Sequence, residues 1–298
     1  MVSPVHGRPL DTSVTEIGGK NVKTKKPASE TGAFLGELSY VRFGSGPENL
    51  VILPGITLEN KSPSRFAAWT YRLGFASFAE EHTVYVISRR RSMPPGYTTR
   101  DMATDYARAM EDELGPSRVM AFSTGGSIAQ YLALDRPELI EKLVLVVSAS
   151  RLSEEGRETC ERWRKLAQGR RWRELRADMA AVNVTSELNK RLARAFMAVF
   201  GRFVLGTPSG TSDFLTTLRA DIDHDTTALL PELSAPTLVI GGSEDPFFPG
   251  DLLRETAGKI PGAELRVYER IGHGVPKERK RRYEDDALAF LGERSASA

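Results

Sequence analysis

Short runs of apolar residues recur along the chain, separated by longer segments whose apolar residues follow helical spacing. Four of these runs are Asn49–Leu53, Thr83–Ile87, Arg118–Phe122 and Lys142–Val147. Strands of a parallel sheet are covered on both faces and therefore read as nearly continuous apolar runs. The segments Ser64–Glu81 and Thr99–Leu114 lie between such runs and predict helices. The pattern predicts an α/β fold, a mostly parallel sheet flanked by helices.

The alternation of strand and helix lapses between Arg151 and about Asp225, where only helical patterns occur, and resumes at Thr237–Ile240. We therefore expect a helical insertion at 151–225, within a core formed by 34–150 and 226–293. Aromatic residues at helical spacing in this region favour packing inside the insertion, and the alternative is that they line a substrate pocket beneath it. These residues are Trp163, Trp172, Phe196 and Phe214.

The segment before the first buried strand has two parts. Residues 1–33 are mainly polar, with a basic stretch, which predicts a flexible tail. Leu35–Phe43 alternates apolar and polar residues, as an antiparallel edge strand does.

A serine stands between one apolar run and the helical segment that follows it. Ser123 comes directly after Arg118–Phe122, and the residues two before and two after it, Ala121 and Gly125, are both small. This arrangement resembles the nucleophile elbow, G-x-S-x-G, of the α/β-hydrolase family, with Ala121 in place of the first glycine. The resemblance implies that Ser123 is a nucleophile at the carboxyl edge of the sheet. It also implies that the N–H of Thr124 stabilises an oxyanion.

The residues that would activate this serine follow later strands. His273 lies in a glycine-flanked loop directly after Glu264–Tyr268, and Asp245 follows the strand that ends at Ile240. The order Ser123, Asp245, His273 is the order that the α/β-hydrolase family uses. Glu244 is the alternative acid, although the family pattern favours the aspartate.

The second oxyanion donor should come from the loop after the third strand, Leu53–Thr57. By position the donor is the N–H of Ile56. Family members often have His-Gly in this loop, and here Pro54 replaces the histidine while Gly55 is kept.

Composition excludes several other classes of protein. The chain has 41 basic and 39 acidic residues and a net charge of +2, so it gives no indication of a nucleic-acid or membrane partner. Cys160 is the only cysteine, which rules out an internal disulfide and favours the cytoplasm. The cluster Asp221–Asp225 includes His224 but suggests helix ends and N-caps rather than a metal site. No metal or organic cofactor is expected.

The resemblance implies an α/β-hydrolase with a helical cap and a Ser-His-Asp triad that transfers an acyl group to water. The expected substrate is a small to medium carboxylic ester, and the partner is thus a small molecule. A lactone, a carbon–carbon bond in a dienoic ketoacid and peracid formation are alternatives on the same residues. A ligand receptor that keeps the fold but turns over slowly or not at all is the alternative outside catalysis.

Overall fold

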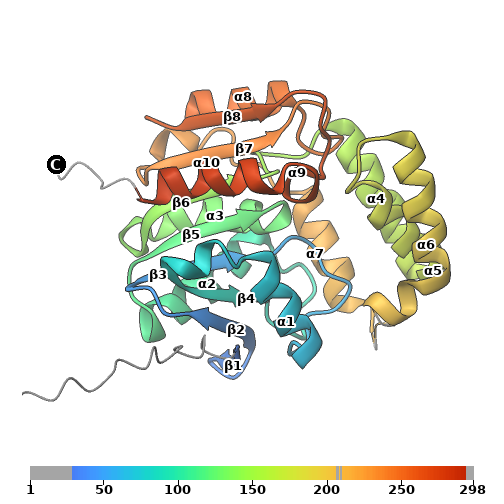
Figure 1. The fold of residues 1–298 in the computed structure, drawn as a ribbon, viewed down its shortest axis with the longest axis horizontal. Coiled ribbons are helices and arrows are strands. Elements are labelled where there is room, and N and C mark those ends of the chain that lie inside the picture. The colour runs from blue at the N-terminus through green and yellow to red at the C-terminus, as the bar shows by residue number, and fades with distance from the viewer. Residues whose placement is uncertain (1–28, 206–207, 209, 293–298) are drawn as a thin grey trace, which may run out of the picture.

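A computed structural model describes residues 29–205, 208 and 210–292 and contains one eight-stranded mixed sheet (Figure 1). The strand order is β1-β2-β4-β3-β5-β6-β7-β8, and every neighbouring pair from β4 to β8 is parallel. The strands are β1 Glu30–Phe34, β2 Leu38–Gly44, β3 Glu48–Leu53, β4 His82–Ile87, β5 Ser117–Phe122, β6 Ile140–Val146, β7 Thr237–Gly242 and β8 Glu264–Tyr268. The predicted fold class is confirmed.

Helices cover both faces of this sheet, and each face has its own apolar core. On one face, side chains of the sheet pack against α2, α3 and α8, and on the other they pack against α1 and α10. These helices are α1 Arg65–Gly74, α2 Thr99–Glu113, α3 Thr124–Asp135, α8 Gly250–Lys259 and α10 Lys280–Gly292. The shorter elements are η1 Phe78–Glu80, η2 Pro137–Leu139, η3 Leu230–Glu232 and α9 Val275–Glu278. The central strands are buried on both sides, which explains their continuous apolar sequence.

Four helices are inserted between β6 and β7: α4 Glu154–Gln168, α5 Trp172–Ala181, α6 Glu187–Leu205 and α7 Ser212–Ile222. In Figure 1 they lie beyond the carboxyl ends of the parallel strands, with α5 and α6 farthest from the sheet and α7 nearest to it. The inserted region formed by α5 and α6 is consistent with a cap. Among the described helices, none combines the length and the apolar composition that a membrane span requires.

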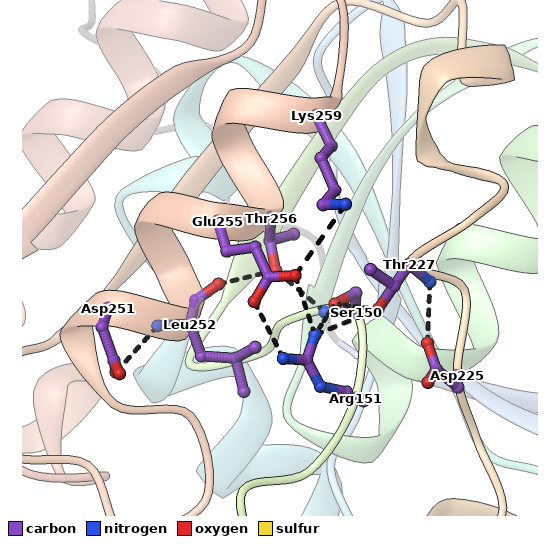
Figure 2. A network of polar contacts seen from close by, with 9 residues as sticks. All are labelled: Ser150, Arg151, Asp225, Thr227, Asp251, Leu252, Glu255, Thr256 and Lys259. Atoms are coloured by element: carbon purple, nitrogen blue, oxygen red, sulfur yellow. Dashed lines mark hydrogen bonds and ion pairs between the residues drawn. The ribbon is translucent and has the colours of Figure 1, made fainter.

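The two ends of the insertion meet at its base (Figure 2). Arg151 and Asp225 form an isolated antiparallel bridge. The Arg151 guanidinium donates to both carboxylate oxygens of Glu255 on α8, at 3.1 and 2.8 Å, and to Thr227 Oγ1 at 3.1 Å. One arginine therefore ties the outgoing and the returning chain to the same core helix.

Three sequence-based expectations in the first 81 residues need correction. The antiparallel edge strand expected at Leu35–Phe43 begins only at Leu38, because Leu35 and Gly36 adopt positive φ angles of 53° and 72° and turn the chain, and the hairpin so formed places β1 rather than β2 at the edge of the sheet. Its first strand, β1, includes residues 30–33, which the sequence assigned to the tail. Residues 1–28 lie outside the described part of the chain. The helix expected at Ser64–Glu81 is divided into α1 and the short η1.

Candidate active site

Ser123 occupies a tight turn between β5 and α3. Its φ of 51° and ψ of −124° place a non-glycine residue in a strained region of backbone space. The first turn of α3 packs closely on the neighbouring loops. A Cβ on Gly125 would lie 2.3 Å from the Leu53 carbonyl oxygen, and one on Gly126 would lie 2.3 Å from Ser148 Oγ. The turn therefore requires glycine at both positions.

Asp245 and His273 form a buried pair at the carboxyl ends of β7 and β8. His273 Nδ1 lies 2.7 Å from Asp245 Oδ2, and the two residues are 8% and 1% exposed. The other carboxylate oxygen, Oδ1, accepts hydrogen bonds from the N–H groups of Phe247 at 2.9 Å and Phe248 at 3.3 Å. An ionised aspartate held in this way favours the tautomer of His273 that carries its proton on Nδ1. Nε2 is then a proton acceptor.

A cavity of about 200 Å³ lies between His273 and Ser123. Ser123, His273, Ile56 and Thr124 all line it. Within the described chain no hydrogen bond joins Ser123 Oγ to His273 Nε2. Catalytic contacts of this kind are often long in the free enzyme and tighten when substrate binds.

Most of the residues by which the insertion lines the cavity are not the aromatic residues singled out in the sequence. Of the four aromatic residues, Trp163 lines the cavity. Phe214 is buried in the apolar core, Trp172 packs against that core, and Phe196 is 52% exposed on α6. The remaining lining residues from the insertion are Leu152, Cys160, Met179, Val182, Asn183 and Asp221. Packing inside the insertion, which helical spacing favoured, is therefore wrong for Phe196 on α6, and the spacing did not show that Trp163 faces the cavity.

The backbone N–H groups of Ile56 and Thr124 are available to a ligand. Both residues line the cavity, and neither N–H donates to an acceptor among the described residues. Thr124 is the first residue of α3, where an N–H has no acceptor within the helix. The positive end of the helix dipole adds to the attraction for negative charge at this point.

Arg89 holds the loop that contains Ile56, a contact that sequence reasoning missed. Its guanidinium is buried and donates to the carbonyl oxygens of Pro54 and Gly55, both at 3.0 Å, and to Thr57 Oγ1 at 3.1 Å. Burial is the main influence that lowers the pKa of Arg89, and neighbouring acidic groups, Asp221 among them, oppose it. In sequence Arg89 is one of three arginines in a basic loop, and nothing in that pattern distinguishes it.

Asp221 is the second residue that sequence reasoning missed. Asp221 lies at a helix end, as expected for this cluster, in the last turn of α7, but it is not an N-cap and is only 4% exposed. Its carboxylate accepts hydrogen bonds from Thr124 Oγ1 at 2.7 Å and Ser127 Oγ at 2.8 Å. Burial raises the pKa of Asp221, while the two hydroxyl groups and the charge of Arg89 lower it.

His224, from the same cluster, makes contacts that do not resemble a metal site. Its Nδ1 lies 3.1 Å from Thr99 Oγ1, and its ring meets Tyr131 edge to face. Burial lowers the pKa of His224 to about 4. No group of three or more metal-ligating side chains is found within the described ranges.

Comparison with known proteins agrees with this arrangement of strands. A family model for the alpha/beta hydrolase fold matches residues 50–279. A 2-hydroxy-6-oxononadienedioate/2-hydroxy-6-oxononatrienedioate hydrolase from Pseudomonas sp is 30% identical over 212 residues, which cover 67% of this chain and 73% of that protein.

Solved structures share the fold at lower identity. An enol-lactonase from Burkholderia xenovorans LB400 superposes with a TM-score of 0.74 and 18% identity, covering 89% of this chain and all of that one. A thermophilic esterase from Thermogutta terrifontis gives a TM-score of 0.66 and 21% identity, covering 88% of this chain and 97% of that one. At these identities the likeness shows the fold alone.

Proposed function

This chain belongs to the alpha/beta hydrolase fold family, and from that premise we propose that it is a serine hydrolase of small, uncharged carboxylic esters. One observation carries the proposal. His273, whose Nδ1 lies 2.7 Å from Oδ2 of the buried Asp245, lines the same cavity as Ser123. A histidine oriented by a buried carboxylate is what a serine hydroxyl needs to become a nucleophile at neutral pH.

In the proposed reaction, Ser123 Oγ attacks the ester carbonyl carbon while His273 Nε2 takes the hydroxyl proton. The N–H groups of Ile56 and Thr124 stabilise the negative charge on the carbonyl oxygen. The bond to the alcohol then breaks, and His273 gives its proton to the leaving oxygen. Water attacks the acyl-enzyme by the same route and releases the acid. Asp245 stabilises the imidazolium in both steps without taking its proton.

The charges around the cavity support an uncharged substrate. No lysine or arginine is among the described residues that line it, whereas Asp221 is. A substrate carboxylate would find no basic side chain in the wall of the cavity to pair with, which disfavours its binding. The Pseudomonas relative is named for dicarboxylate substrates. We therefore rank ester hydrolysis above cleavage of a carbon–carbon bond in such a dianion.

The cysteine in the cavity is not a competing nucleophile. Cys160 lines the same space, but burial raises the pKa of its thiol. The thiolate is the reactive form of cysteine, so this side chain stays unreactive near neutral pH. The serine remains the group that an acyl donor would meet.

Two measurements test the proposal together. The first is labelling by a fluorophosphonate, with mass spectrometry of the peptide that contains Ser123 and with Ser123→Ala as the control. The second is turnover of p-nitrophenyl acetate, butyrate and octanoate, an enol-lactone, a dienoic ketoacid and peracetic acid formation from acetate and peroxide.

We expect labelling at Ser123, turnover of the short neutral esters, and a loss on the order of 10³-fold or more in Ser123→Ala. Labelling elsewhere, or faster turnover of the ketoacid than of any ester, would overturn the proposal. A labelled serine with no turnover of any compound in the panel would favour the ligand receptor.

A further inference from the structure

The last helix of the insertion is fastened to the core at both of its ends. At the start of α7 the Asp213 carboxylate accepts hydrogen bonds from the N–H groups of Ser92 and Met93, at 3.1 and 3.0 Å. At its end Arg157 of α4, which belongs to the insertion itself, donates to the carbonyl oxygen of Ile222. His224, just beyond the helix, contacts the first residue of α2. These contacts fix the place of Asp221 relative to the sheet.

Asp221 meets the first turn of α3 in an unusual way. A carboxylate at a helix N-terminus ordinarily accepts from backbone N–H groups. Asp221 instead uses one oxygen for the hydroxyl of Thr124 and the other for that of Ser127, the first and fourth residues of the helix. The N–H of Thr124 is thereby left without an acceptor among the described residues, although a carboxylate lies beside it. The residue is held by its side chain, and its N–H remains available.

We propose that Asp221 is a positioning residue that fixes the Thr124 N–H for the oxyanion through the Thr124 hydroxyl. This inference rests on the proposed function. It makes the oxyanion hole depend on a residue of the insertion, since α7 must be docked for Asp221 to reach α3.

Arg89 is the counterpart of Asp221 on the other side of the hole. A buried carboxylate beside a developing oxyanion is unfavourable unless a positive charge lies nearby. The fully buried Arg89 supplies one while it holds the carbonyl groups of Pro54 and Gly55. Each of the two donors, Ile56 and Thr124, is thus fixed by one buried charged side chain.

The test uses the full-length protein and four single variants. Thr124→Val removes the hydroxyl and keeps the backbone N–H, and Thr124→Ser restores a hydroxyl. Asp221→Asn removes the charge and one of the two acceptors. Asp223→Asn is the matched control, because Asp223 ends the same helix but is exposed and pairs with Arg219. A cooperative thermal unfolding transition shows that each variant is folded.

The main readout is the second-order rate constant of labelling by a fluorophosphonate, which needs the oxyanion hole but no knowledge of the natural substrate. We expect Thr124→Val and Asp221→Asn each to lower it about 10-fold, and Thr124→Ser and Asp223→Asn to stay within about 2-fold. The double variant Thr124→Val, Asp221→Asn should lose no more than the worse single variant, because both act through one hydrogen bond. With an ester that is turned over, kcat should fall and KM should not change.

If the wild-type protein is labelled at Ser123, the following outcomes would contradict this inference without contradicting the proposed function. These are a wild-type rate in Thr124→Val, losses that multiply in the double variant, or a rise in KM without a fall in kcat. The last would make Asp221 a residue that binds substrate. A wild-type protein that is not labelled at all would overturn the proposed function and this inference with it.

Discussion

At the scale of single residues, the proposed chemistry depends on one carboxylate. Asp245 holds His273 through Oδ2 and is itself held through Oδ1, so its side chain has little freedom. Asp245→Asn places an amide opposite Nδ1 and favours the wrong tautomer of the histidine. We expect kcat to fall by about 10³- to 10⁴-fold with little change in structure. Steady-state kinetics on a short ester measures the loss.

The neighbouring glutamate provides the control for this substitution. Glu244 is the alternative acid in sequence, but its backbone N–H bonds to Ile271 while the carboxylate that contacts His273 is that of Asp245. Glu244→Gln should therefore keep kcat within about 3-fold of the wild type. A larger loss in Glu244→Gln than in Asp245→Asn would mean that the assignment of the acid is wrong.

A second residue-scale prediction concerns His224 and acid stability. Burial lowers its pKa to about 4 in the folded protein, whereas an unfolded histidine has a pKa of about 6.5. Between these values the unfolded chain binds a proton that the folded chain does not, so stability falls as pH falls through this window. Stability from His224 is fully present above pH 6.5. From pH 7.5 to pH 5.0 the linked loss is about 2 kcal/mol.

Urea unfolding of the wild type and of His224→Gln at both pH values isolates this contribution. Other titrating groups change the stability of both proteins equally. The difference between the wild type and the variant in the free energy of unfolding lost from pH 7.5 to pH 5.0 is therefore due to residue 224. We expect the wild type to lose about 2 kcal/mol more than the variant. Equal losses in the two proteins would show that His224 is not buried in its neutral form.

At the scale of elements, the sequence predicted the features that depend on residues close together in the chain. The buried strands, α2, the helical insertion and the elbow all follow from apolar runs, helical spacing and small residues within a few positions. The hairpin of β1 and β2 was missed because it depends on positive φ at Leu35 and Gly36, and leucine is not an expected turn residue.

The two site residues that the sequence did not identify, Arg89 and Asp221, act through contacts between positions far apart in the chain. Arg89 meets Gly55 across 34 positions, and Asp221 meets Thr124 across 97. Arg89 lies in a run of arginines and Asp221 in a group of aspartates, and nothing in the sequence distinguishes either as the buried residue. Only the fold brings them to the loop and the helix that they hold.

The loop between β3 and α1 gives the element-scale prediction. Arg89 spans two adjacent carbonyl groups with the two ends of one guanidinium, a geometry that the single ammonium group of lysine cannot reproduce. Arg89→Lys keeps the charge but should free the loop that presents the Ile56 N–H. We expect about a 10-fold lower kcat on a short ester with KM unchanged.

The control for this variant lies two residues away. Arg91 is exposed, and Arg91→Lys should leave kcat at the wild-type value. If both lysine variants retain full activity, the loop is rigid without Arg89, and its geometry is set by its own backbone.

At the scale of the whole molecule, the insertion divides into an anchored part and an outer part. Arg151 ties the two ends of the insertion to α8, and α7 is fastened to the core along its length. The outer helices α5 and α6 pack mainly on each other (Figure 1). Apolar side chains of α6 remain exposed, among them Leu188, Leu192 and Phe203. Elements that bury less apolar surface open at lower free energy than central strands.

Amide hydrogen exchange should therefore separate three classes of element. We expect the fastest exchange in α5 and α6, slower exchange in α7, and the slowest in β5 and β6. A phosphonate bound at Ser123 should slow exchange in α5 more than in β5, since Met179 of α5 and the two residues after the helix, Val182 and Asn183, line the cavity. The Ser123→Ala protein with the same reagent is the control.

If α5 and α6 exchange as slowly as β5 with and without the phosphonate, the insertion is part of the rigid core. If α7 exchanges as fast as α6, the contacts of Asp213 and Asp221 do not hold it, and the oxyanion hole is independent of the insertion.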